Sequence, residues 1–135
     1  MIRLAIASAF ALTVGLTAAS ASPVVGQPAP AFAAVDSNGK SHALAEFKGK
    51  TVILEWTNDG CPYVKKHYGS GNMQKTQQDL TAAGVVWLSI ISSAPGKQGY
   101  VEGAGANDLT ASRGAHPTAV LLDPKGTVGR AYDAQ

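Results

Sequence analysis

The chain is poor in cysteine: Cys61 is the only one among 135 residues. A single cysteine excludes an internal disulfide and a structural zinc site built on several thiolates. The scattered histidines add no recognised ligand spacing, so we expect no metal and no cofactor. A lone cysteine is then either a small buried apolar group or a group retained for its reactivity.

An excess of charge of one sign is also lacking. Eleven Lys and Arg face nine Asp and Glu, which gives a net charge of +2. The basic residues do not form a block of the kind that nucleic acid attracts, so we expect no nucleic-acid partner. The one small basic cluster, over residues 65–67, either lies on a solvated helix face or changes the reactivity of the nearby cysteine.

One apolar stretch stands out at the N-terminus. Arg3 precedes the run Leu4–Ala19, which is shorter than the ~20 strongly apolar residues of a membrane span. Ala19 and Ala21 have the spacing that signal peptidase recognises. We therefore predict a signal peptide over residues 1–21, cleaved after Ala21, and a periplasmic or secreted protein without stable membrane association. An uncleaved N-terminal anchor is the alternative.

The length after residue 21 suits one domain, residues 22–135. Asn-Gly within residues 36–39 predicts a hairpin between Phe32–Val35 and Ser41–Leu44. The continuous apolar run Thr51–Trp56 predicts a strand covered on both faces. The further elements that we expect are a helix over 62–68 broken at 69–71, a helix over 73–83 with a core stripe of Met73, Thr76, Leu80 and Ala83, and a buried strand over 85–91.

The segment 92–115 is rich in Gly, Ser and Ala, and it predicts a flexible connection with one short helix over 107–112. A third strand over 118–122, a turn over 123–126 and a helix over 128–134 complete the pattern. Strand, helix and strand with a buried sheet indicate a βαβ unit in an α/β fold.

Cys61 lies where a strand leads into a helix that Pro62 begins. Ligands and chemistry gather at this carboxyl edge of open α/β sheets. Unpaired N–H groups and the positive end of the helix dipole favour the reactive thiolate there. Lys65 shares the helix face of the cysteine and can add to this effect. His67 points elsewhere, which disfavours a cysteine–histidine hydrolase, although His42 or His116 can approach from other segments.

The segment from Val52 to Tyr68, VILEWTNDGCPYVKKHY, resembles the thioredoxin-like redoxins related to alkyl hydroperoxide reductase and thiol-specific antioxidant proteins. The lead-in from Val25 to Phe32 and the segment from Leu44 to Lys50 are similar too. The resemblance implies a thioredoxin-like fold, with a central mixed sheet flanked by helices and an N-terminal hairpin. It also implies peroxide reduction or disulfide exchange at Cys61, with an external thiol or a thioredoxin-like protein as reductant.

We accordingly expect Cys61 and Lys65 to be catalytic. The residues that we expect to shape the site are Trp56, Asn58, Pro62, Tyr63 and Pro117. Thioredoxins carry a second cysteine where Val64 stands, and peroxiredoxins carry Pro and Thr or Ser where Leu54 and Asn58 stand. These departures leave open the alternative of a catalytically inactive thioredoxin-fold module that binds a partner protein.

In this family a helix such as the one over 128–134 is followed by a strand that opens with a cis-proline. The sequence ends at Gln135, so we expect a domain that is incomplete at its C-terminus. Alternatively, Pro117 and Thr118 form that proline turn and residues 119–122 the strand after it.

Overall fold

A computed structural model describes residues 22–134; the predicted signal peptide and its cleavage site after Ala21 lie outside the described residues. In chain order the elements are β1 (Ala33–Asp36), β2 (Ser41–Ala43), the 3-10 helix η1 (Leu44–Phe47), β3 (Val52–Trp56), α1 (Pro62–Gly69), α2 (Asn72–Ala82), β4 (Val86–Ile91), α3 (Gly103–Ser112), β5 (Ala119–Leu122) and α4 (Thr127–Ala131). None of these helices is long and apolar enough to cross a membrane.

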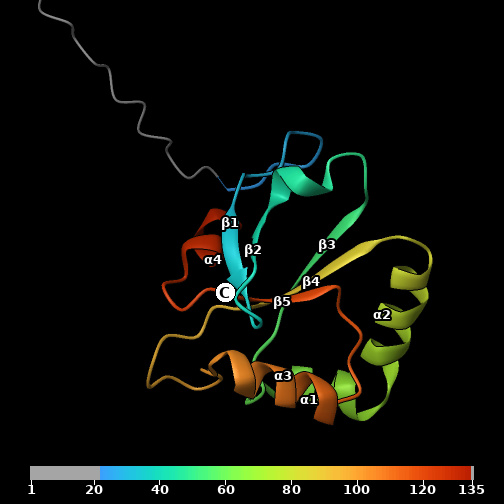
Figure 1. Cartoon of the computed structure of the whole chain (residues 1–135), viewed down its shortest axis with the longest axis vertical. Helices are drawn as coiled ribbons and strands as arrows, with labels where there is room; N and C mark the ends of the chain where they lie inside the picture. The colour runs from blue at the N-terminus through green and yellow to red at the C-terminus, as the bar shows by residue number, and fades with distance from the viewer. Residues whose placement is uncertain (1–21, 135) are drawn as a thin grey trace, which may run out of the picture.

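The five strands form one mixed sheet in the order β2-β1-β5-β4-β3. β3, β4 and β5 run parallel, while β1 is antiparallel to both β2 and β5. Figure 1 shows α4 beside β1, away from α1, α2 and α3. The predicted α/β class, the mixed sheet and the N-terminal hairpin are therefore confirmed.

The hairpin turn is held by the buried carboxylate of Asp36. Its Oδ1 accepts the N–H groups of Asn38 and Lys40, both at 2.9 Å, and its Oδ2 lies 2.9 Å from His42 Nε2. Burial alone would raise the pKa of Asp36, but the hydrogen bonds from His42 and the two N–H groups outweigh it and lower the pKa. Gly39 has φ 84°, the left-handed conformation that the Asn-Gly pair predicted.

The core lies on both faces of β4, all six residues of which are buried. On one face Leu88, Ile90 and Leu121 pack with Val128 of α4. On the other, Ile91 and Val120 pack with Ala106 of α3. This arrangement follows from parallel strands that carry apolar side chains on both faces.

The burial of two elements differs from the prediction. β3 is covered on both faces, since Leu54 and Trp56 pack against the core and Glu55 faces α1 and α2, but each of its residues stays partly exposed because only β4 pairs with it in the described sheet. The predicted core stripe of α2 is wrong, since its one buried residue is Gln77 and Ala83 is exposed. The reason lies opposite α2, where β3 presents the polar side chain of Glu55 to Gln77.

α3 is longer than the predicted helix over 107–112, and two glycines of the predicted flexible connection allow close packing. A Cβ on Gly103 would collide with the backbone oxygen of Ser37. Gly99 has φ 80°, and a Cβ there would lie 2.5 Å from the side chain of Asn58. The absence of side chains here lets the segment approach the hairpin and the loop after β3.

Candidate active site

Cys61 is the N-cap residue of α1. Its backbone is extended (φ −73°, ψ 126°), and Pro62 occupies the first helical position. The Cys61 carbonyl accepts the Lys65 N–H at 3.0 Å, and the residue is partly exposed. The predicted position, a free cysteine between a strand and a helix start, is confirmed, although β3 is an edge strand of the described sheet.

Asn58 holds the loop that carries Cys61. Its backbone oxygen accepts the Cys61 N–H at 3.0 Å, and its Oδ1 accepts the Gly60 N–H at 2.8 Å. Its Nδ2 donates to the backbone oxygen of Gln98 at 3.2 Å. Asn58 thus joins the cysteine loop to the segment before α3.

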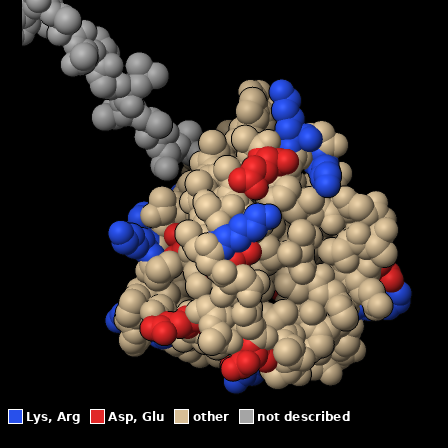
Figure 2. Space-filling view, viewed as in Figure 1, with Lys and Arg blue, Asp and Glu red and all other residues tan. Residues whose placement is uncertain are grey.

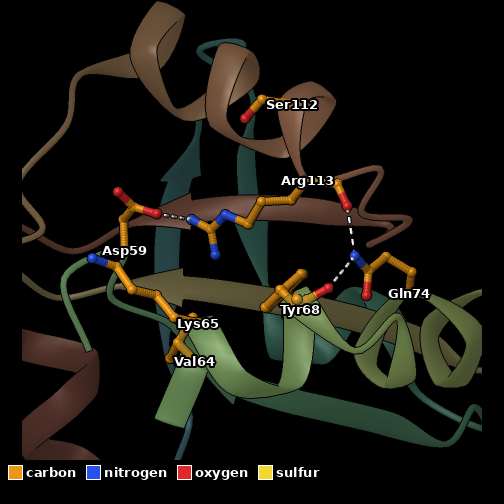
Figure 3. A pocket seen from close by; sticks show the side chains of 8 residues that line it. Asp59, Val64, Lys65, Tyr68, Gln74, Ser112 and Arg113 are labelled. Carbon is orange, nitrogen blue, oxygen red and sulfur yellow. Dashed lines mark hydrogen bonds and ion pairs between the residues drawn. The ribbon is translucent and has the colours of Figure 1, made fainter. Parts of the chain in front are cut away.

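A cleft of about 370 Å³ lies between α1 and the end of α3. The residues that line it are Asp59, Val64, Lys65, Tyr68, Gly69, Gln74, Ser112 and Arg113. Figure 3 shows Val64 and Lys65 on the α1 side and Arg113 reaching across toward Asp59. Cys61 is not among the lining residues, but the lining begins two residues before it and resumes three residues after it.

Arg113 is a fixed cation at this cleft, because its side chain is only 13% exposed. Nη1 donates to Thr57 Oγ1 at 3.1 Å, and the guanidinium lies 4.8 Å from the centre of the Tyr68 ring. Nη2 lies 4.0 Å from Oδ1 of Asp59, a side chain that is 55% exposed. The Arg113 carbonyl also accepts a hydrogen bond from Gln74 at 2.7 Å, which ties α2 to the end of α3.

Behind the cleft, the carboxylate of Glu55 accepts four hydrogen bonds. Tyr68 Oη donates to Oε1 at 2.8 Å. Three buried donors reach Oε2: Gln77 Nε2 at 3.0 Å, Trp87 Nε1 at 2.8 Å and Ser89 Oγ at 2.8 Å. These five residues form the Glu55 cluster, which joins α1, the helix that begins after Cys61, and α2 to the strands β3 and β4.

Burial raises the pKa of Tyr68, and the charge of Glu55 and the hydrogen bond to it add to the shift. An unfolded tyrosine ionises near pH ~10, so above that pH the unfolded chain loses a proton that the folded chain keeps. The free energy of unfolding should therefore fall by up to about 1.4 kcal/mol per pH unit through this group. The alkaline slope is the fall in the free energy of unfolding per pH unit at alkaline pH. We predict that Tyr68→Phe removes the contribution of this group to the alkaline slope, as measured by urea unfolding from neutral to alkaline pH.

Tyr63→Phe is the matched control for Tyr68→Phe, because Tyr63 lies on the same helix with 75% of its surface exposed. The alkaline slope of this variant should equal that of the wild type. An equal slope in Tyr68→Phe and the wild type would contradict the prediction.

The other residues predicted to shape the site are dispersed. Trp56 lies on the α4 face, where its Nε1 donates to Ser92 Oγ at 3.2 Å and its ring centre is 5.8 Å from that of Tyr132. Tyr63 projects into solvent. Pro117 lines a small void together with Thr57 and Tyr68. The peptide bonds of the described residues are all trans, and β5 runs parallel to β4, so the alternative that made Pro117 the cis-proline turn is wrong.

Sequence reasoning missed Arg113 and Gln77. Arg113 is the only Lys or Arg between Lys97 and Lys125, within a segment otherwise rich in small residues, and that isolation was a usable signal. Glu55, an acid inside the apolar run of β3, was another, because a carboxylate among apolar residues needs hydrogen-bond donors. Gln77 gave no such signal, since polar residues surround it in α2.

Residues 25–135, which include the whole described sheet and the Cys61 helix start, match the AhpC/TSA family. The chain belongs to the AhpC/TSA family. No curated protein matches this AhpC/TSA chain.

On the face seen in Figure 2 its charged side chains are scattered and form no block of one sign.

Solved structures similar to this AhpC/TSA chain share its thioredoxin-like fold. An uncharacterized conserved protein from Geobacillus kaustophilus has TM-score 0.69 and 23% identity, over 81% of this chain and 57% of that one. A secreted Mycobacterium tuberculosis disulfide oxidoreductase homologous to E. coli DsbE has TM-score 0.59 and 17% identity, over 76% of this chain and 67% of that one. The thioredoxin domain of a thiol-disulfide oxidoreductase from Bacteroides vulgatus has TM-score 0.61 and 20% identity, over 84% of this chain and 74% of that one. The chain thus spans little more than half of the Geobacillus protein.

Proposed function

We propose that this AhpC/TSA-family chain is an exported thiol-dependent oxidoreductase in which Cys61 is the nucleophile. It reduces peroxides or exchanges with disulfides, and an external thiol or a thioredoxin-like protein restores it. The observation that carries the proposal is the position of Cys61, partly exposed at the N-cap of α1. Reactive cysteines of thiol enzymes are found at helix N-termini of this kind.

The chemistry follows from the presence of one cysteine. With a peroxide, the thiolate sulfur bonds to one oxygen while the O–O bond breaks, and the leaving oxygen takes a proton as water or an alcohol. The resulting sulfenic acid condenses with an external thiol to a mixed disulfide and water, and a second thiol releases Cys61. Val64 stands where thioredoxins carry a second cysteine, so the resolving thiol comes from another molecule.

Export is part of the proposal, and the leader pattern of residues 1–21 supports it. The similar Mycobacterium tuberculosis disulfide oxidoreductase is itself described as secreted. In an oxidising compartment a single thiol meets small disulfides, and these are suitable exchange partners for Cys61. Mass analysis of the exported chain, with Ser22 as the first residue, tests this point.

The helix-start effect on Cys61 predicts faster alkylation. A stabilisation of 0.3–1 kcal/mol corresponds to about a two- to fivefold higher rate than in the unfolded chain. The measurement is the rate of reaction with iodoacetamide at neutral pH, for the folded chain and for the chain in urea. Lys65→Gln should lower the folded-state rate, because Lys65 is one turn away on the helix face of Cys61.

Lys66→Gln is the matched control, since it removes the same charge from the next position of α1. Its alkylation rate should stay close to that of the wild type. A Cys61 that reacts no faster in the folded chain than in urea would favour the alternative, a catalytically inactive module that binds a partner protein.

A further inference from the structure

We propose that the cleft between α1 and α3 binds the carboxylates of a small thiol, so that a carboxylate-bearing low-molecular-weight disulfide is the exchange partner of Cys61. This inference rests on the proposed function, because it names the partner of the same cysteine. Its independent evidence is the cleft itself, which is built from two stretches that are distant in sequence, residues 59–74 and residues 112–113.

The charges of the cleft favour an anion. Its titratable charged residues are Lys65, Arg113 and Asp59, two cations and one anion. Arg113 is held by Thr57 and the Tyr68 ring, so its guanidinium is preorganised for a carboxylate. The Asp59 carboxylate is 4.0 Å from Arg113 and mostly exposed, which makes it a weak competitor for this cation.

The dimensions also suit a small ligand. A volume of about 370 Å³ lies within the range of small-molecule sites. A second hollow of about 550 Å³ shares Asp59 and Ser112 with the cleft and extends it along α3. Asp59 and Asp108 are the charged residues that line this second hollow, so the carboxylate of the ligand belongs in the first cleft and the second hollow offers room for its uncharged part.

The cleft is close to Cys61 along the chain. Val64 lines it from the first turn of α1, three residues after Cys61, and residues three apart on a helix have Cβ atoms about 5–6 Å apart. A carboxylate that pairs with Lys65 therefore lies about one helical turn along α1 from Cys61.

The reaction is a balanced exchange. The Cys61 thiolate attacks one sulfur of the small disulfide, a bond forms between the two sulfurs, and the original S–S bond breaks. The leaving thiolate carries away the electron pair and takes a proton from water. The product is Cys61 joined to one half of the small disulfide, with its carboxylate held in the cleft.

The test compares two small disulfides, glutathione disulfide, which carries carboxylates, and hydroxyethyl disulfide, which carries none. The measurement is the rate of mixed-disulfide formation at Cys61, followed by mass spectrometry, and the ratio of the two rates reports carboxylate binding. Ser112→Glu places a negative charge in the cleft from an exposed position and should lower this ratio roughly fivefold. High salt should lower the wild-type ratio as well.

Ala111→Glu is the matched control, because it adds the same charge one residue earlier on α3 at an exposed position outside the cleft lining. Its ratio should remain near that of the wild type. Equal ratios in the wild type, Ser112→Glu and Ala111→Glu would overturn the cleft proposal while Cys61 exchange stands. A Cys61 that reacts with neither disulfide faster than the unfolded chain does would overturn the proposed function as well.

Discussion

Replacing Glu55 with leucine should lower the free energy of unfolding by at least about 3 kcal/mol, because each of three buried donors left without a partner costs about 1–3 kcal/mol. Leucine fills a similar volume but accepts no hydrogen bond. Trp87 Nε1, Ser89 Oγ and one N–H of Gln77 would then lose the acceptor that they share in the wild type. A loss of this size is comparable to the whole stability of many domains.

Glu55→Gln is the variant that isolates this cause. The amide keeps one oxygen, which can accept from the same three donors, and its NH₂ group replaces the oxygen that faces Tyr68 Oη. The expected loss is about 1 kcal/mol, the difference between a charged and a neutral acceptor. Urea unfolding followed by circular dichroism measures both variants, and equal midpoints for Glu55→Leu and Glu55→Gln would contradict the account.

The parts of the fold that the sequence predicts well are those with strong local signals. The Asn-Gly turn fixes the hairpin, and the left-handed Gly39 is found where that pair requires it. Pro62 marks the first residue of α1, and together with the apolar run before it this mark places Cys61 between a strand and a helix start. Apolar runs likewise locate β4 and β5, because a buried strand leaves few polar positions.

The parts that the sequence does not predict depend on contacts between distant residues. Gln77 is buried because Glu55, twenty-two residues earlier, offers it an acceptor, and no periodicity within α2 encodes that pairing. Arg113 follows α3, whose approach depends on Gly99 packing closely against Asn58 and on Gly103 packing closely against Ser37 of the hairpin. A glycine-rich stretch indicates flexibility and close approach equally well, so the sequence alone does not separate the two.

Cys61→Ser should abolish both peroxide consumption and mixed-disulfide formation, down to the rate of the reagents without protein, because a serine hydroxyl neither forms a thiolate nor bonds to sulfur. The folded state should survive, since serine is among the preferred N-cap residues and Cys61 makes no side-chain cap hydrogen bond of its own. The loss of activity in this variant therefore reports chemistry rather than unfolding.

Two assays on the wild type and Cys61→Ser separate the two proposed reactions. Consumption of hydrogen peroxide in the presence of dithiothreitol measures peroxide reduction, and a trapped sulfenic acid at Cys61 should accompany it. Mixed-disulfide formation with hydroxyethyl disulfide measures exchange without any peroxide. Exchange without peroxide consumption would assign Cys61 to disulfide chemistry. This outcome would agree with the sequence, in which Leu54 and Asn58 stand where peroxiredoxins carry Pro and Thr or Ser. Activity that is unchanged in Cys61→Ser would remove the cysteine from the mechanism altogether.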